Sequence, residues 1–283
     1  MSPLVSVLMT AYNREKYIAE AIESVLTQTF TDFELIIVDD RSGDKTHEIT
    51  LAYAAKDPRI RVYRNEKNLG DYHNRNRAAE LARGKYLKYV DSDDYIYTHG
   101  LQVMVDMIQR FPSAAVALGA PSDWVRPFPI ELSPYDAYRR HYFEAPVLAK
   151  ASLSAIILAS AFRSVGGFSG KRWVGDFELW HTLAAHYSVL LIPDGLVYWR
   201  YHDEQEDYNN RTLPLVNFEY LLISIEQLSK PDCPLMALEK AKALRRVKWE
   251  QARMILRQIK SLRVHEAARL LRRLKLSLGK GST

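Results

Sequence analysis

The chain has 283 residues, of which 47% are hydrophobic and 26% charged, and it contains one cysteine. This composition is ordinary for a globular protein and excludes collagen-like, disordered and coiled-coil classes for the chain as a whole. A single cysteine excludes an intrachain disulfide and favours a reducing compartment, and no run of about 18 apolar residues predicts a membrane-spanning helix.

Positive charge is concentrated at the C-terminal end. Residues 236–283 contain 14 Lys and Arg against three acidic residues, a net charge of +11, so that the rest of the chain carries −6 of the total of +5. A basic tail of this kind favours an anionic partner, either a membrane surface or a nucleic acid. The alternative is a solvated helical face without a partner.

The first 120 residues alternate between short apolar runs and amphipathic stretches. The runs predict strands at 5–10, 33–38, 60–63, 85–90 and 114–118, and the stretches predict helices at 14–28, 44–55, 71–82 and 100–110. Alternation of this kind predicts an α/β fold, a mostly parallel sheet with helices on both faces.

The second half is less regular. Residues 121–146 contain five prolines and many aromatic residues, which predicts a loop-rich connection such as a substrate lid. After it we expect a strand near 154–161, a helix at 176–186, strands near 189–192 and 196–201, and helices from 211 to the end. The expected domains are therefore a sheet domain at 1–210 and a basic helical extension at 211–283.

Polar clusters follow three of the expected strands, at 10–13, 39–42 and 91–94. Parallel strands bring their carboxyl ends to one edge of a sheet, where ligands bind. Asp91, Asp93 and Asp94 repel one another unless a cation offsets their charge, and Mn²⁺ or Mg²⁺ prefers such oxygen ligands. The alternative is a solvated acidic turn. No glycine-rich phosphate loop follows the first strand, which argues against an NAD-type fold and a P-loop enzyme.

The ordered motifs resemble those of family 2 glycosyltransferases. They are VSVLMTAYN at 5–13, FELIIVDDRS at 33–42, GKYLKYVDSDD at 84–94, VGGF at 165–168, GDFELW at 175–180 and YWRYH at 198–202. The resemblance covers about residues 4–205. It implies a GT-A (Rossmann-like) fold, a nucleotide-sugar donor, a divalent metal and inversion at the anomeric carbon.

The same resemblance assigns residues to the nucleotide. It implies that Thr10, Ala11 and Tyr12 line the nucleobase pocket, with Tyr12 stacked on the base. Asp40, or its neighbour Asp39, would accept a hydrogen bond from a base N–H, a contact that favours uracil. An aspartate after a strand also commonly caps the following loop.

Further positions follow from the resemblance. They are the diphosphate contact Arg75, the ribose contact Asp91, and the metal contacts Asp93, Asp94 and His202. The stretch Asp71-Tyr72-His73, before Arg75, departs from the family, which more usually has small residues there.

Asp176 matches the family's catalytic base, which takes the proton from the acceptor hydroxyl. It is also a suitable helix N-cap. Glu178 is the second candidate base, but the two side chains lie roughly 200° apart around a helix and do not both point inward. Trp173 and Trp180 are candidates to stack on acceptor sugars, although core packing is the more frequent place for such residues.

We therefore expect an inverting, metal-dependent glycosyltransferase, cytoplasmic and peripheral to a membrane, that uses a UDP-sugar and a saccharide or lipid-linked acceptor. The amphipathic residues 238–278 would contact an anionic membrane, the chain's own domain or a second copy in a homodimer. Two alternatives are a sugar-phosphate nucleotidyltransferase, which would be expected to carry a glycine-rich basic loop, and a nucleic-acid-binding protein acting through the tail.

Overall fold

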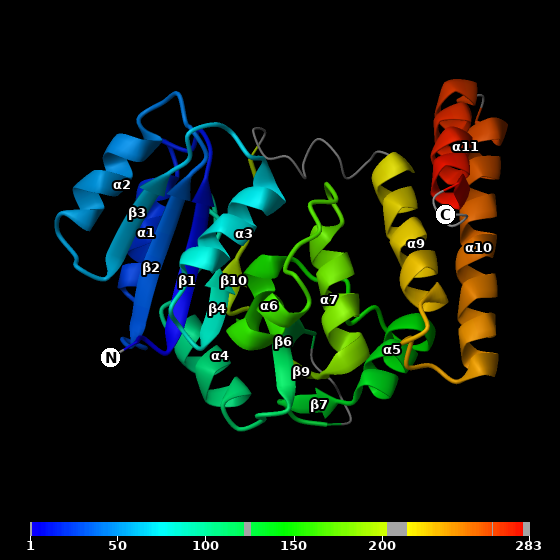
Figure 1. Cartoon of the computed structure of the whole chain (residues 1–283), viewed down its shortest axis with the longest axis horizontal. Helices are drawn as coiled ribbons and strands as arrows, with labels where there is room; N and C mark the ends of the chain where they lie inside the picture. The colour runs from blue at the N-terminus through cyan, green and yellow to red at the C-terminus, as the bar shows by residue number, and fades with distance from the viewer. Residues whose placement is uncertain (1, 122–125, 203–213, 262, 280–283) are drawn as a thin grey trace.

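The computed structural model describes residues 2–121, 126–202, 214–261 and 263–279, and its centre is an eight-stranded sheet (Figure 1). The strand order is β3-β2-β1-β4-β8-β6-β9-β7. The strands are β1 (Val5–Ala11), β2 (Phe33–Asp39), β3 (Ile60–Arg64), β4 (Tyr86–Tyr89), β6 (Ala114–Ala120), β7 (Ile130–Leu132), β8 (Ala155–Leu158) and β9 (Ser188–Pro193). Only β7 and β8 run against their neighbours, so the expected, mostly parallel sheet is confirmed.

The strand order reverses beside β1. The chain proceeds outward from β1 through β2 to β3 and then returns to β4 on the other side of β1. The carboxyl ends of β1 and β4 therefore mark a topological switch point, and open α/β sheets bind ligands in the crevice at such a point.

Helices cover both faces of the sheet, as expected. On one face lie α1 (Ile18–Leu26), α2 (Thr46–Ala54) and α4 (Gly100–Ile108), and on the other lie α3 (Asp71–Leu81), α5 (Pro134–Phe143), α6 (Ala159–Ser164) and α7 (Gly175–His186). Side chains of β1 alternate between the two cores, with Val7 and Met9 in one and Leu8 in the other. Burial on both faces explains why this strand is mostly apolar, with Ser6 and Thr10 as its only polar residues.

The expected lid at 121–146 is wrong for its described part. Residues 130–143 form β7 and α5, and Tyr138 and Tyr142 of α5 are buried in the core. Pro134 occupies the first turn of α5, and the Ser133 hydroxyl accepts a hydrogen bond from the Asp136 N–H at 3.1 Å. A proline after a serine thus begins a helix here instead of marking a loop.

Smaller differences affect three other elements. The first helix begins at Ile18 instead of residue 14, and the strand at 154–161 ends at Leu158, where α6 follows. The strand expected at 196–201 is only the two-residue β10 (Val197–Tyr198), which pairs with β5 (Tyr95–Ile96) in a separate small sheet.

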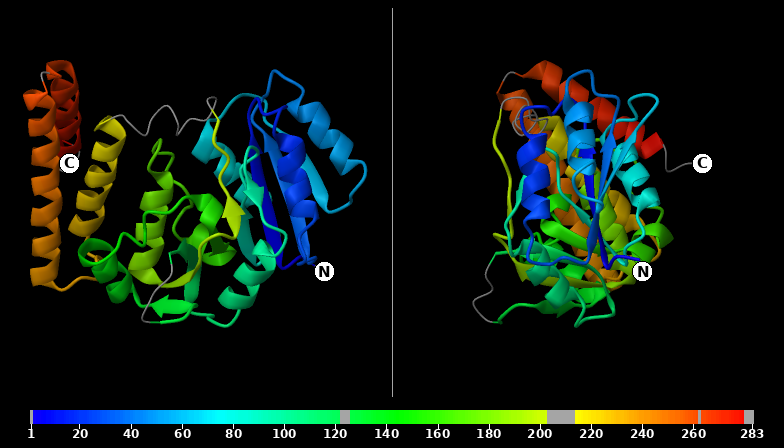
Figure 2. Two further views of the ribbon diagram at one scale, coloured as in Figure 1. Left: turned by 180° about the vertical axis from the view of Figure 1, so that it is seen from behind. Right: turned by 90° about the vertical axis from the view of Figure 1, so that its left-hand side faces the viewer.

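The C-terminal helices are continuous with the core. They are α9 (Pro214–Ser229), α10 (Ala237–Lys260) and α11 (Val264–Gly279). Leu228, Leu235, Ala243 and Val247 belong to the same apolar cluster as strand β6, and α9 packs between α7 and the other two helices (Figures 1 and 2). The expected domain boundary at 210/211 lies outside the described residues. Over the described parts of the chain, every helix is too short or too polar to span a membrane.

Candidate functional site

The loops after β1 and β2 hold each other in place at the crevice. The Asn13 N–H donates to the Ser42 hydroxyl at 2.9 Å, and the Gly43 N–H donates to Asn13 Oδ1 at 2.8 Å. A pocket between these loops is lined by Arg14, Tyr17 and Asp44, among others.

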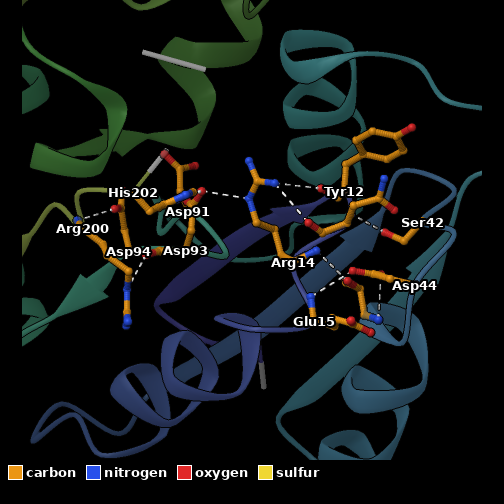
Figure 3. A network of polar contacts seen from close by, with 12 residues as sticks. Tyr12, Arg14, Glu15, Ser42, Asp44, Asp91, Asp93, Asp94, Arg200 and His202 are labelled. Atoms are coloured by element: carbon orange, nitrogen blue, oxygen red, sulfur yellow. Dashed lines mark hydrogen bonds and ion pairs between the residues drawn. The ribbon is translucent and has the colours of Figure 1, made fainter. Parts of the chain in front are cut away.

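The three residues expected at the nucleobase lie beside these loops. Thr10 and Ala11 end β1, where they pair with Val38 and Asp39 of β2. The Tyr12 side chain is half-exposed and points away from Asp91, Asp93 and Asp94 (Figure 3).

Asp39 and Asp40 are both buried and both hold loops. Asp39 Oδ1 accepts from the Ser42 N–H at 3.1 Å, and its other oxygen lies 3.0 Å from Nε of Arg64. Asp40 accepts hydrogen bonds from Asn65, from the Leu69 N–H at 2.8 Å and from the Gly70 N–H at 2.9 Å. In this structure the two carboxylates therefore perform the loop capping that an aspartate after a strand also predicts.

Asp91, Asp93 and Asp94 follow β4 and contact residues from distant parts of the chain (Figure 3). Asp93 Oδ2 lies 2.8 Å from Nε of Arg14 and 3.1 Å from Nε2 of His202. Asp94 Oδ1 accepts from the Arg200 N–H at 2.9 Å. The structure thus brings together His202 and Asp93, both of which the resemblance assigns to the metal, and adds Arg14 and Arg200, which the sequence analysis did not identify.

The charges in this cluster destabilise one another. Burial, together with repulsion from Asp91 and Asp93, raises the pKa of Asp94 to about 8. Burial also raises the pKa of Asp91, against the opposing effect of Arg75. A divalent cation stabilises the ionised form of carboxylates whose pKa values are raised in this way.

The side chains of this cluster are suitable ligands for a metal ion but do not form a complete metal site by themselves. Carboxylate oxygens and one imidazole nitrogen suit Mn²⁺ or Mg²⁺, and the buried Nδ1 of His202 has no hydrogen-bond partner. Among the described residues, no group of three or more His, Cys, Asp and Glu is arranged to hold a metal ion. Oxygens of a bound phosphate would have to complete the coordination.

Arg75 links Asp91 to Asp71 and to Ser152. It extends from α3 with only 9% of its surface exposed. Its guanidinium contacts Asp71 at 2.7 Å, Asp91 at 2.7 Å and the hydroxyl of Ser152 at 3.0 Å. The fixed fork of guanidinium donors allows one side chain to hold all three groups.

Asp176 lies opposite, in the first turn of α7. Gly175 lets the helix begin against Tyr72, because a Cβ atom at 175 would lie 2.6 Å from the Tyr72 ring. Tyr72, part of the departure from the family pattern, therefore fills the space that Gly175 leaves. The helix has no side-chain cap, so the capping alternative for Asp176 is not realised.

Only one of the two oxygens of the Asp176 carboxylate has a hydrogen-bond partner among the described residues. Oδ2 accepts from the Ser152 N–H at 2.9 Å, and Oδ1 is buried without a hydrogen-bond partner among the described residues. Burial raises the pKa of Asp176 to about 7, although Arg75 opposes the shift. A carboxyl group of this kind is matched to proton transfer near neutral pH. Glu178 points elsewhere, with Oε1 held by the Lys171 ammonium at 2.7 Å.

The two tryptophans expected at an acceptor have different environments. Trp180 is fully buried and its indole N–H donates to the Lys150 carbonyl at 2.7 Å, so it is a core residue without access to a sugar. Trp173 is only partly buried, has a positive φ of 69°, and packs beside Phe177 and Tyr220. A positive φ is a strained conformation for so bulky a residue.

Ser152 and Lys88 are the main positions that the sequence analysis missed. Lys88 is fully buried in β4, and its ammonium donates to the carbonyl of Leu153 in the 3₁₀ turn Ser152–Ser154. That turn supplies both Ser152 contacts, to Arg75 and to Asp176. In the sequence, a lysine inside an otherwise apolar strand marks Lys88 as unusual, whereas no pattern marks an isolated serine such as Ser152.

We expect Lys88→Met to stabilise the protein near pH 7. Burial lowers the pKa of Lys88 to about 7, against about 10.4 in an unfolded chain. Between these pH values the unfolded state therefore binds more protons than the folded state. The free energy of unfolding of the wild type should rise by on the order of 3 kcal/mol from pH 7 to 10. Urea unfolding across this range should show no such rise in the variant. Lys85→Met, an exposed neighbour, should keep the wild-type slope, and parallel curves for all three proteins would contradict the assignment.

Comparison with known proteins shows the family of the chain. The family model described as glycosyl transferase family 2 matches residues 6–151, just over half of the chain. The chain is 36% identical over 119 residues to the glycosyltransferase GlyG of Streptococcus pneumoniae, covering 42% of this chain and 39% of GlyG. It is 40% identical over 113 residues to chondroitin synthase of Escherichia coli, covering 40% and 16%. The chain thus matches well under half the length of these curated relatives.

Solved structures share the fold. S. aureus TarS in complex with UDP-GlcNAc superposes with a TM-score of 0.69 at 23% identity, covering 86% of this chain and 70% of that one. The mannosyltransferase PcManGT of Pyrobaculum calidifontis, in complex with GDP-Man and Mn²⁺, gives 0.62 at 17% identity, covering 98% and 81%. The mixed sheet flanked by helices, with helices after it, is therefore the fold of known glycosyltransferases.

Proposed function

Since the chain belongs to glycosyl transferase family 2, we propose that it transfers a sugar from a UDP-sugar to a hydroxyl of a saccharide or lipid-linked acceptor, with inversion at the anomeric carbon. The reaction would serve polysaccharide or glycoconjugate synthesis in the cytoplasm. The observation that carries the proposal is the convergence of the Asp176 carboxylate and the Asp91–Asp94 cluster on one crevice, linked through Arg75 and Ser152. Family membership favours this reaction over a nucleotidyltransferase, and an enzyme over a non-catalytic nucleic-acid-binding protein.

Asp176 is the proposed general base. Its unpartnered Oδ1 would take the proton of the acceptor hydroxyl as the hydroxyl oxygen attacks the anomeric carbon. The bond from that carbon to the diphosphate breaks, and its electron pair leaves with the nucleoside diphosphate. The Ser152 N–H fixes the carboxylate from its other oxygen, and Trp173, three residues earlier, is the proposed acceptor contact.

The opposite side of the crevice is the proposed donor site. Tyr12 would stack on the base beside Thr10 and Ala11, with Asp39 and Asp40 shaping the pocket through the loops that they hold. Asp91, held by Arg75, would face the ribose.

The metal, Mn²⁺ or Mg²⁺, is the proposed cofactor, and Asp93, Asp94 and His202 would hold it. When bound, it would offset the negative charge that develops on the departing diphosphate. The solved complex of PcManGT, which contains Mn²⁺ together with GDP-Man, supports this choice of ion.

Calorimetric binding of UDP, GDP, CDP and dTDP, each with and without Mn²⁺, tests this donor site. We expect UDP to bind best and to need the metal, and we expect Asp93→Asn to weaken binding by on the order of tenfold or more, because a charged ligand is lost. Asp57→Asn is the control, since Asp57 pairs with Arg59 at the surface, away from the crevice. If no nucleotide binds in a metal-dependent manner, the proposed function is wrong.

A further inference from the structure

Helices α10 and α11 expose large apolar side chains. Leu238, Trp249, Leu256 and Ile259 of α10 are 83%, 65%, 50% and 46% exposed, and Leu271 and Leu276 of α11 are 48% and 61% exposed. At 100° per residue, the four positions on α10 fall within about 80° of one another around the helix. They therefore form a stripe instead of isolated surface residues.

The opposite side of α10 already has its packing partners. Ala243, Val247, Gln251 and Ile255 are buried against α9 and the sheet domain. The helix thus has two apolar sides, and the chain's own domain covers only one of them within the described residues. Exposed apolar patches of this kind mark interaction sites.

Basic side chains lie within and beside the stripe on α10, and others are exposed on α11. Lys242, Arg245, Lys248, Arg253 and Lys260 of α10, and Arg269, Arg272 and Lys275 of α11, are all exposed. The three acidic residues of these helices, Glu239, Glu250 and Glu266, are only partly exposed, and two have cationic neighbours: Glu250 lies 3.2 Å from Arg253, and Glu239 lies 3.8 Å from Arg139. At the same spacing of 100° per residue, Arg245 lies inside the arc of the stripe, and the other four of these basic residues on α10 lie within about 40° of its edges. This side of α10 is therefore both apolar and positive.

We propose that this side of α10, together with the exposed side chains of α11, docks on a membrane surface rich in anionic lipids. Trp and Leu side chains would enter the interface while Lys and Arg contact the headgroups. A second copy of the chain fits less well, because a symmetric contact would place this positive surface against itself. A nucleic acid would match the charge but not the exposed leucines.

The orientation of the pair is compatible with the reaction. The C-terminal end of α10 and the start of α11 lie at the same end of the molecule as the carboxyl ends of β1 and β2 (Figures 1 and 2). A lipid-linked acceptor in the docked membrane would therefore reach the end of the molecule that carries the crevice. This step alone rests on the proposed function; docking itself does not.

Sedimentation of the full chain with lipid vesicles tests the proposal. We expect binding to vesicles of equal parts phosphatidylcholine and phosphatidylglycerol to be at least about tenfold tighter than to phosphatidylcholine alone, and to weaken as salt rises. Trp249→Ser with Leu256→Ser, and separately Arg245→Gln with Lys248→Gln, should each reduce it about tenfold. These four side chains are exposed, so circular dichroism should show folded variants.

The matched control is Lys56→Gln with Arg110→Gln, which removes two exposed charges from other parts of the surface and should leave binding unchanged. Equal loss in this control would show non-specific attraction and overturn the proposal. Equal binding to neutral vesicles would overturn it as well. Absence of vesicle binding, with a dimer in light scattering that the Trp249→Ser, Leu256→Ser variant abolishes, would instead assign this surface to a second copy. Duplex DNA that binds as tightly as the anionic vesicles would assign it to a nucleic acid.

Discussion

Asp176→Asn is expected to lower the turnover number by about 10²–10⁴-fold, the usual contribution of general base catalysis, while leaving donor binding unchanged. The amide cannot accept the proton of an attacking hydroxyl but nearly preserves the shape of the carboxylate. Turnover with a radiolabelled nucleotide-sugar measures the first effect, and calorimetric titration with the same nucleotide measures the second. Loss of donor binding as well would place Asp176 in the donor site instead.

The pH dependence of the wild type provides a second measure of the same residue. Because burial raises the pKa of Asp176 to about 7, the base is protonated and inactive below that value. The turnover number should therefore rise through pH 7 and level off above it. Glu178→Gln is the matched control, since Glu178 is held by Lys171, and it should keep both the rate and the profile. A pH profile that is flat from pH 5 to 9 would exclude Asp176 as the base.

The sheet was predictable because its strands are buried on both sides. Residues 5–11 and 33–39 are almost completely buried, so each appears in the sequence as a mostly apolar run, and the polar residues after each run mark the strand end. The ordered motifs then placed Asp91, Asp93 and His202 at one edge, and the structure brings His202 within 3.1 Å of Asp93. Local pattern and fold agree in this half of the chain.

The parts that sequence did not predict depend on contacts between distant residues. Ser152 is central only because Arg75 and Asp176 reach it from α3 and α7, and no local pattern reports that meeting. Arg14 and Arg200 became site residues in the same way, through Asp93 and Asp94. The misassigned lid has another cause, since the prolines that predicted a loop include Pro134, which begins α5. Proline within the first turn of a helix is compatible with the helix.

Arg75→Met is expected to destabilise the fold by about 2–3 kcal/mol, less than the cost of breaking a fully buried ion pair, because only the arginine is buried. Arg75 is the cation that Asp71 and Asp91 share, and the side chains of these two residues are 43% and 26% exposed, so its loss leaves two partly solvated carboxylates without their common cation. Urea unfolding at pH 7.5 measures the loss. The difference from wild type should shrink as pH falls and the carboxylates become protonated, because Arg75 stabilises only their ionised forms.

Arg77→Met separates this effect from the general cost of removing an arginine from α3. Arg77 lies two residues further along the same helix, half-exposed, and its pair with Glu80 is a surface contact at 3.1 Å, worth less than about 1 kcal/mol. Arg75 also lowers the pKa of Asp176, so residual activity in Arg75→Met should rise with pH at a higher value than in the wild type. Equal stability losses in the two variants, or an unshifted pH profile, would mean that Arg75 does not couple Asp91 of the proposed donor site to the proposed base, Asp176.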